Sequence, residues 1–187
     1  MTGTEPSSTR PTSTEPTSTE PTIARLRGAA AKDVVLRYFA ALAAGDQQAI
    51  RDSWAVDGTC WYGGDLPISG LWRGRDRVID GFLATAFAHL DPEREIGIRV
   101  TNVFGEGEQV FVEWDSWATG RTGRPYRQAN SGVFSVRGGQ IATMREYADT
   151  QGWERALIDG AGTGPGTGSA SGTGTGTGTG EAPAPLR

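Results

Sequence analysis

The chain has 187 residues, a formal net charge of −4 at pH 7, one lysine and one cysteine. Its arginines are scattered among acidic residues, so there is no basic stripe for nucleic acid, and no apolar run is long enough to span a membrane. The lone Cys60 excludes an internal disulfide, and the N-terminus lacks the charged-then-apolar order of a signal peptide. We therefore expect a cytoplasmic protein with no nucleic-acid or membrane partner.

Low-complexity sequence occupies both ends of the chain. Residues 1–23 contain three copies of a Ser-Thr-Arg/Glu-Pro-Thr repeat, and a Gly-Thr run dominates residues 160–187. Segments without large apolar side chains bury too little surface to offset the entropy lost on ordering, so we predict two disordered tails. The foldable segment is residues 24–159, which is long enough for one domain with a core of its own.

The first half of this segment has helical periodicity. Val35, Tyr38, Phe39 and Leu42 recur at helical spacing, and Gly45 is a favourable helix end because glycine adopts the left-handed conformation at low cost. Two glycines and a proline predict a structured bend after the first strand. The predicted elements are helices over residues 29–44, 46–54 and 75–88, a strand over 59–62 and a loop over 63–70.

The second half changes to the period of a strand. Apolar and polar residues alternate over four segments joined by short glycine-containing connections, which predicts an antiparallel meander. The segments are residues 96–104, 110–119, 126–136 and 141–148, followed by a turn of helix over 153–158. Since helices precede strands, the fold class is α+β. A strongly curved antiparallel sheet wrapped over about three helices gives a cone-shaped domain with an internal pocket.

Several local motifs carry a resemblance to a known family. They are Tyr38–Leu42 with Gly45-Asp46, Trp54–Thr59, Gly64–Gly70 with Trp72–Asp76, Gly132–Phe134 with Gly139–Ile141, and Arg145–Asp149. In this order they resemble the SnoaL-like and ketosteroid-isomerase-like family of the nuclear transport factor 2-like superfamily. The resemblance implies a hydrophobic small-molecule ligand and a homodimer formed through the convex sheet face. It leaves the activity open, because this fold hosts isomerases, cyclases, epoxide hydrolases and non-catalytic binders.

The acidic residues of the last strands are the candidate catalytic groups. Glu113 and Asp115 share one face of their strand with Phe111 and Trp117, and alternation alone is equally consistent with a solvated face and with a pocket. Resemblance to limonene-epoxide-hydrolase-like members places Asp115 and Glu146 at that group's two acidic positions. Glu113 stands where those members have an arginine, which counts against epoxide hydrolysis by the same arrangement.

Convergence of these acids in one apolar cavity would raise the pKa of at least one of them. A protonated and an ionised carboxyl, Asp115 and Glu146, could then act as acid and base. An arginine could instead neutralise them as a structural ion pair, which is a common arrangement.

The remaining site candidates are polar or aromatic. Homologous register points Gln128 and Asn130 inward, where their amides could bind a polar ligand group, and Tyr62 could orient the ligand. Tyr38 could donate a phenolic hydrogen bond, although core packing is the more usual role. Two tryptophans flank the loop at the expected pocket rim and could shape its mouth, although packing is again the usual role: Trp61 and Trp72.

Metal and cofactor chemistry is not expected. The single histidine, His89, falls at the predicted end of the third helix, and no cluster of ligand residues has metal-binding spacing. The sequence favours a cofactor-independent isomerase, cyclase or hydrolase that acts on a hydrophobic polyketide- or terpenoid-like metabolite. The alternative is a non-catalytic small-molecule-binding or dimeric scaffold domain.

Overall fold

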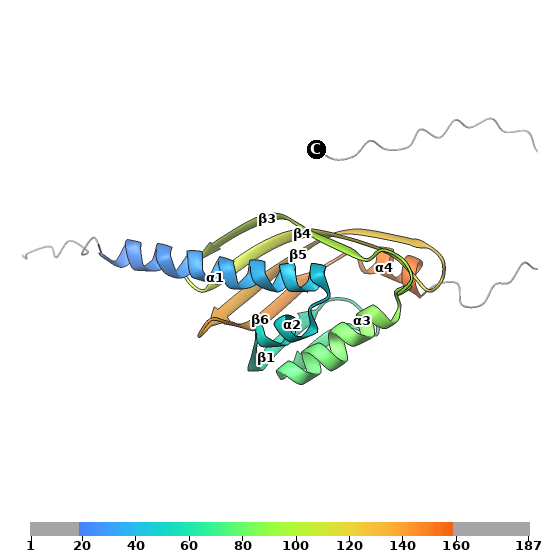
Figure 1. The fold of residues 1–187 in the computed structure, drawn as a ribbon, viewed down its shortest axis with the longest axis horizontal. Helices are drawn as coiled ribbons and strands as arrows, with labels where there is room; N and C mark the ends of the chain where they lie inside the picture. Colours follow the sequence, from blue (N-terminus) through green and yellow to red (C-terminus); the bar gives the residue numbers. More distant parts are fainter. Residues whose placement is uncertain (1–18, 159–187) are drawn as a thin grey trace, which may run out of the picture.

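The computed structural model of the chain describes residues 19–158, and the tail predictions for residues 1–18 and 159–187 lie outside them. Figure 1 shows α1, α2 and α3 on one side of a curved sheet. In chain order the elements are α1 (Thr19–Ala44), α2 (Gln47–Asp52), β1 (Trp54–Tyr62), β2 (Gly70–Arg73), the π-helix η1 (Arg77–Leu83), α3 (Ala84–Ala88), β3 (Gly97–Glu106), β4 (Gln109–Thr119), β5 (Pro125–Arg137), β6 (Gln140–Tyr147) and α4 (Thr150–Leu157).

The strands of the described segment form one six-stranded sheet in the order β2-β1-β6-β5-β4-β3. The meander predicted from β3 to β6 is confirmed, with antiparallel pairing at each step. One pairing differs from the wholly antiparallel sheet expected from the sequence, because β1 lies parallel to β6. Parallel neighbours need a long connection rather than a hairpin, and here the chain between β1 and β6 supplies it. The α+β class with a curved, unclosed sheet is confirmed.

Some element boundaries differ from the predicted ones. α1 begins at Thr19, so residues 19–23, assigned to the N-terminal tail, are helical. Pro21 is tolerated there because the N–H groups of a first helical turn have no partner within the helix. β1 begins at Trp54, which is fully buried and lies in the strand rather than in the preceding helix. β2 follows the predicted loop and was not predicted as a strand, and it pairs with β1 as a short edge strand.

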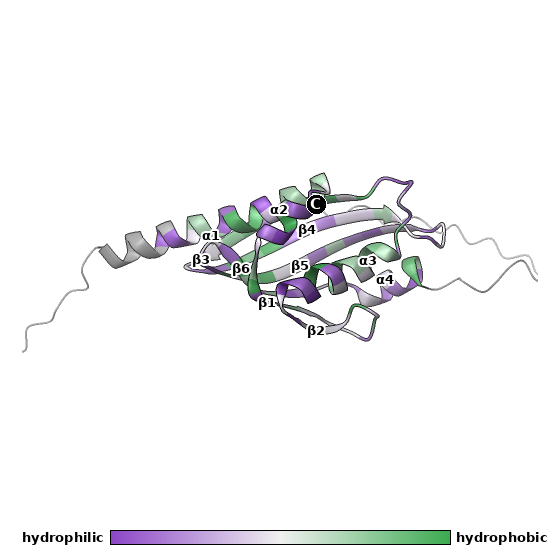
Figure 2. Ribbon diagram, turned by 60° about the horizontal axis from the view of Figure 1, so that its bottom comes forward, coloured by the Kyte–Doolittle hydropathy of each residue, from purple (hydrophilic) through white to green (hydrophobic). Residues whose placement is uncertain are grey.

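The core lies between the inner face of the sheet and the helices. α1 crosses this face and places Val35, Tyr38 and Phe39 in it. Tyr38 meets Trp54 edge-on at a centroid distance of 5.8 Å and Phe134 in a tilted contact at 6.4 Å. In Figure 2 hydrophobic and hydrophilic residues alternate along α1 and along the strands, as expected for elements with one buried side. No helix within residues 19–158 combines the length and hydrophobicity needed to cross a bilayer.

Strand alternation divides the sheet into two unlike faces. On β4 the inner positions Val110, Val112 and Trp114 are buried, whereas Glu113 is exposed and Asp115 is half-buried on the outer side. The same alternation on β5 buries Gln128 and Asn130. Only polar groups on the side of each strand that faces α1 can therefore reach an internal site.

Candidate functional site

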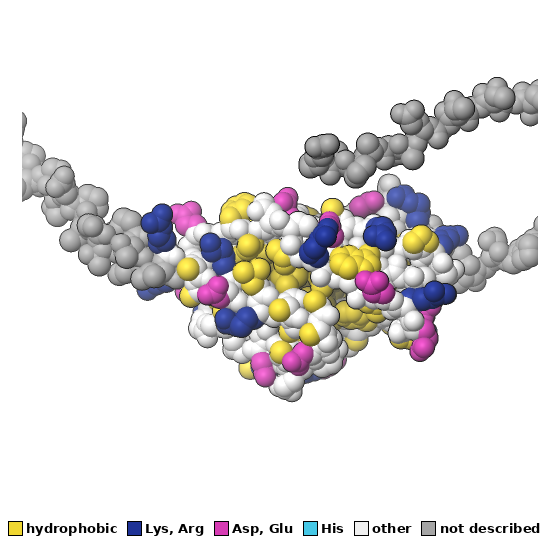
Figure 3. Space-filling view, turned by 45° about the horizontal axis from the view of Figure 1, so that its top comes forward, with side chains coloured by type: hydrophobic (Ala, Val, Ile, Leu, Met, Phe, Trp, Pro, Cys, Tyr) yellow, Lys and Arg dark blue, Asp and Glu magenta, His cyan; other side chains and the backbone are white. Residues whose placement is uncertain are grey.

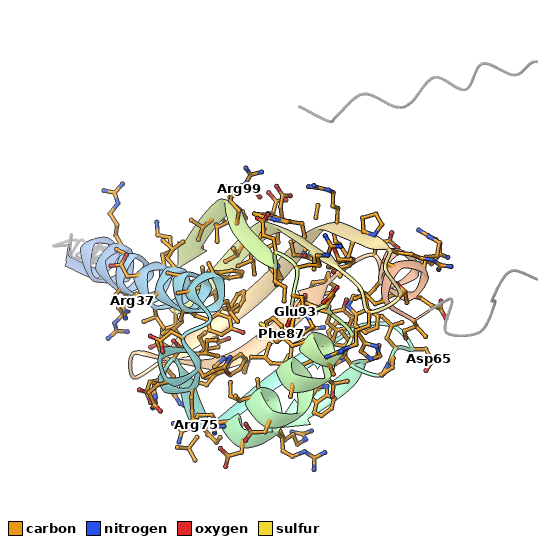
Figure 4. The ribbon with its side chains drawn as sticks, turned by 45° about the vertical axis from the view of Figure 1, so that its right-hand side comes forward. Arg37, Asp65, Arg75, Phe87, Glu93 and Arg99 are labelled. Atoms are coloured by element: carbon orange, nitrogen blue, oxygen red, sulfur yellow. The ribbon has the colours of Figure 1, made fainter. Side chains whose placement is uncertain are left out.

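A cavity of about 150 Å³ lies between the inner sheet face and the helices. Its walls are mostly aromatic and aliphatic, with contributions from α1, η1, α3, β4 and α4. At its mouth Phe87 and Ile96 are 39% and 41% exposed, although both are large apolar residues. Figure 4 shows Phe87 near the middle of the molecule, whereas Arg37 and Arg99 project outward. Figure 3 shows hydrophobic side chains gathered at the centre of one face, with charged groups around them.

Glu146 is the acidic residue of this cavity. It lies on β6, between Tyr62 of β1 and Gly132 of β5 in the sheet register. Within residues 19–158 no hydrogen bond or ion pair joins its carboxyl to another residue. Burial raises the pKa of Glu146 to about 8. The resting carboxyl is therefore mostly protonated at neutral pH and faces an otherwise apolar space.

Hydroxyl and amide groups surround this carboxyl. Asn130 lines the cavity and its Nδ2 donates to Ser116 Oγ at 2.9 Å. Burial raises the pKa of Tyr126 to about 12, an effect that Ser116 beside it partly opposes. Burial, reinforced by the charge of Glu146, also raises the pKa of Tyr62. The inner ends of β1, β4, β5 and β6 thus bring neutral hydrogen-bonding groups to one side of the cavity.

Gln128 lies just behind this polar side. It is buried and does not line the cavity, and its amide has no hydrogen bond of standard geometry within the described segment. The amide nevertheless lies close enough to the Tyr62 hydroxyl to oppose the rise in the pKa of that phenol. Gln128 is therefore placed to orient Tyr62 rather than to contact a ligand directly.

The expected convergence of Asp115 and Glu113 with Glu146 is wrong. Both acids lie on the outer face, where Arg99 donates to Asp115 at 2.8 Å and Asn102 Nδ2 donates to Glu113 at 3.1 Å. The physical reason is the alternation of β4, whose inner positions are filled by Val112 and Trp114. The solvated-face alternative describes these two acids correctly.

The two rim tryptophans also lie outside the cavity. Trp61 is on the outer face, 5.5 Å from Tyr147 and beneath the guanidinium of Arg145 at 5.4 Å. Trp72 packs against Gly81, and its Nε1 donates to the Ile68 carbonyl at 3.0 Å. Both tryptophans serve packing, which was the alternative interpretation of each.

Tyr38 contributes to both the core and the cavity. It is almost fully buried, it lines the cavity, and burial raises the pKa of its phenol. Cys60 lies nearby, and burial likewise raises the pKa of its thiol, so the thiol is neutral and unreactive at physiological pH. Four of the nine sequence candidates therefore line the cavity: Tyr38, Tyr62, Asn130 and Glu146.

Two polar residues of the site were missed by the sequence analysis. Ser116 lies on β4 on the opposite face from Asp115. Knowing which face of β4 points inward would have identified Ser116. Tyr126 shares its facing with Gln128 and Asn130, and the alternation on β5 already contained this signal. His89, near the end of α3, stacks edge-on against Trp153 at 5.1 Å. Residues 19–158 contain no group of three His, Cys, Asp or Glu side chains positioned to hold a metal ion.

The curved sheet and the covering helices have the fold of nuclear transport factor 2-like proteins. The chain belongs to the SnoaL-like domain family, whose model matches residues 35–144. The resemblance inferred from the sequence motifs is confirmed. A search of curated proteins found no match.

Solved structures with the same fold come from several bacteria. A putative SnoaL-like polyketide cyclase from Jannaschia sp. CCS1 is 19% identical, with a TM-score of 0.60 over 71% of this chain and 94% of that one. An epoxide hydrolase from M. tuberculosis, of the LEH-like type, is 19% identical, with a TM-score of 0.56 over 71% and 92%. A protein of ketosteroid isomerase-like fold from Catenulispora acidiphila, solved in complex with trimethylamine, is 21% identical, with a TM-score of 0.52 over 61% and 83%. At these identities the likeness establishes the fold alone.

Proposed function

We propose that this protein is a cytoplasmic, cofactor-independent enzyme that transfers a proton within a compact, hydrophobic polyketide- or terpenoid-like metabolite. The reaction class is an isomerisation, cyclisation or hydrolysis, and Glu146 is the proton-transferring residue. The observation that carries the proposal is a carboxyl without a partner in an apolar cavity, with its pKa raised to about 8. A group with a pKa near the working pH gives and takes a proton with little free-energy cost.

The neighbours of Glu146 suit the same role. A protonated Glu146 donates a hydrogen bond or a proton to a ligand oxygen, and the hydroxyls of Tyr62 and Tyr126 add donors on the same side. The Nδ2 of Asn130 is engaged with Ser116, which leaves the oxygen of that amide to accept from a ligand hydroxyl. The apolar walls exclude water, which strengthens each of these interactions.

The proposal is tested with a panel of cyclic enones, cyclic epoxides and small polyketide-like ketones in deuterated buffer. Mass spectrometry detects deuterium incorporation and isomerised, cyclised or hydrolysed products. For any substrate that turns over, Glu146→Gln should lower kcat/KM by about 10²–10⁴-fold, the usual contribution of general acid–base catalysis. Because the protonated form is the active one, wild-type kcat/KM should fall as the pH rises above about 8.

The matched control is Asp115→Asn, which makes the same carboxyl-to-amide change on the outer face. It should retain wild-type kcat/KM within about twofold, since surface substitutions away from a site change little. Equal loss in both variants, or full turnover in Glu146→Gln, would overturn the proposed role of Glu146.

The second candidate function is non-catalytic binding of a small molecule. The favouring observation is that only one acid lines the cavity within the described segment, so no acid–base pair is present there. The trimethylamine complex of the Catenulispora acidiphila protein is consistent with binding in this fold. Binding of panel members by calorimetry, without turnover of any of them, would favour this function.

We also propose that a second copy of the chain covers the outer sheet face. This face exposes Phe104 at 58%, stacked on Phe111 at a centroid distance of 4.9 Å, together with Tyr147. The pairs Arg99–Asp115 and Asn102–Glu113 give the same surface both charge signs, which suits a self-complementary contact. Size-exclusion chromatography with light scattering tests this, and a monomer at micromolar concentration would contradict it.

A further inference from the structure

A carboxylate formed at Glu146 would have no counterion in the part of the chain that the structure describes. The residues lining the cavity include no lysine, arginine or histidine. Arg145, the next residue along β6, points to the opposite face, with its guanidinium 5.4 Å from the Trp61 ring. A bound ligand is therefore the remaining source of a positive charge beside this carboxyl.

The walls of the cavity are suited to a cation of low polarity. Aromatic rings from α1, η1, β1, β4 and β5 line it, among them Tyr38, Phe82 and Trp114. The face of an aromatic ring carries negative electrostatic potential, so it attracts an ammonium group, most strongly where water is excluded. An acid together with several ring faces is the combination that recognises alkylammonium ions.

The size of the cavity limits the ligand. An engineered apolar cavity of about 150 Å³ holds benzene, and the cavity here has about the same volume. Its mouth at Phe87 and Ile96 gives additional room for a group attached to one ring. A single-ring body with a small ammonium substituent therefore matches the available space.

The other titratable groups near Glu146 do not change charge near neutral pH. Tyr38 from α1, Cys60 and Tyr62 from β1, and Tyr126 from β5 all lie near Glu146, and burial raises the pKa of each. All four are neutral between pH 6 and pH 9. Glu146 is therefore the group of the cavity whose charge changes in that range.

We infer that this cavity binds compact hydrophobic ammonium ions, protonated amines or quaternary ammonium compounds, with the cationic nitrogen against the Glu146 carboxylate and the hydrocarbon body between the aromatic rings. Binding converts the resting carboxylic acid to a carboxylate and releases its proton to the buffer. The inference concerns the same site as the proposed function, but it uses the ionised form of Glu146 where the proposed function uses the protonated form.

The probe is phenyltrimethylammonium, whose charge is permanent, so any pH dependence of its affinity belongs to the protein. Calorimetry with the full chain at pH 6, 7, 8 and 9 should show Kd falling about tenfold per pH unit up to the pKa of Glu146 and levelling off above it. At pH 7, titrations in two buffers of different ionisation enthalpy should show release of about one proton per ion bound.

The controls separate charge from shape. Glu146→Gln should weaken binding of the cation about thirtyfold or more at pH 9, the loss expected when one partner of a buried charge pair is removed, and should abolish the pH dependence. Asp115→Asn should bind it as the wild type does. The neutral isostere tert-butylbenzene should bind wild type and Glu146→Gln alike at pH 6, where Glu146 is protonated, which also shows that the variant keeps its cavity.

A pH-independent Kd, or equal affinity of the Glu146→Gln variant for the cation, would overturn the inference. Its failure is distinguishable from failure of the proposed function. Turnover that depends on Glu146, without cation binding, would overturn this inference alone. Cation binding that depends on Glu146, without turnover of any panel compound, would support it and contradict only the enzymatic role.

Discussion

Each face of the sheet carries a carboxyl, Asp115 of β4 on the outer face and Glu146 of β6 on the inner face, in different environments. On the outer face Asp115 has Arg99 at 2.8 Å, and both side chains reach solvent. On the inner face Glu146 of the adjacent β6 has no charge partner among the described residues, and burial raises its pKa to about 8. Two carboxyls of one sheet therefore differ in their chemistry, because Asp115 has an arginine beside it and Glu146 lines a mostly apolar cavity.

The surroundings of a carboxyl, rather than the number of acids on neighbouring strands, therefore indicate which acid is the candidate reactive group. An ion pair at the surface is screened and stabilises little, and it holds a carboxylate ionised. An unpaired acid in an apolar cavity stays protonated and destabilises the fold whenever it ionises.

The same substitution on the two faces should have the largest contrast in stability. Phe134→Ala removes a fully buried ring that contacts Tyr38 and Phe39, and we expect a loss of about 3–5 kcal/mol. Phe104→Ala removes a ring that is 58% exposed, and should cost less than about 1 kcal/mol in a monomer. Denaturant unfolding measures both. A large, concentration-dependent loss for Phe104→Ala would indicate that a second copy buries this face.

Glu146 should make stability depend on pH in a direction opposite to that of an ion-paired acid. The pKa of Glu146 is about 8 in the folded chain and about 4.5 in the unfolded chain, so between these values only the folded chain holds the proton. Stability should fall as the pH rises through this window and level off above it. The gain in stability of Glu146→Gln over wild type should therefore widen between pH 5 and pH 8, by up to about 4 kcal/mol.

Urea unfolding of both proteins at several pH values measures that difference. Asp115→Asn serves as the control, and its difference from wild type should change little over the same range. A constant difference between Glu146→Gln and wild type from pH 5 to pH 8 would contradict the raised pKa of Glu146.

The contact between Trp117 and Gly97, two residues that line the cavity, can be tested by substitution. The Trp117 indole lies over Gly97, where a methyl group would overlap the ring, and its Nε1 donates to Glu95 at 2.8 Å. Gly97→Ala should displace the indole, break this hydrogen bond and cost about 1–3 kcal/mol. In a Trp117→Ala background the same change should be nearly neutral. Melting temperatures of wild type, the two single variants and the double variant give a double-mutant cycle. Additive losses of stability in this cycle would contradict the contact.

The outer ion pair should have the smallest effect. Arg99→Ala and Asp115→Asn should each cost less than about 1 kcal/mol, because both partners are well exposed. Thermal unfolding at low and high salt checks this, since whatever the pair contributes should decrease with salt. A loss above about 2 kcal/mol would mean that this face is shielded from solvent.

Much of the fold could be predicted from the sequence because its signals are local. The helical spacing of Val35, Tyr38 and Phe39 and the alternation over residues 110–119 correctly gave the element types and the meander. The π-helix η1 and the short edge strand β2 could not be predicted in this way. Both depend on packing partners outside the element itself, such as Trp72 against Gly81 and Cys60 beside Trp72.

The candidate site was predicted only in part, because local patterns do not show which face of a strand is covered. The alternation along β4 predicts that Glu113 and Asp115 share one face of the strand, but it does not predict which face of the strand packs against α1. The parallel pairing of β1 with β6, which sets Tyr62 beside Glu146, likewise joins residues far apart in the sequence. The inward facing of Gln128 and Asn130, expected from homologous register, agrees with the burial of both side chains on β5.

The α+β class, the family resemblance and the polar residues able to line a pocket follow from local patterns in the chain. The carboxyl that lines the cavity could be identified only once the helices were seen to cover the inner face of the sheet. α1 covers the inner face of β4 and leaves Asp115 outside, while β1 and β5 flank Glu146, which lines the cavity. Burial, which is a property of the assembled sheet and helices, converts that one ordinary glutamate into the candidate acid of the site.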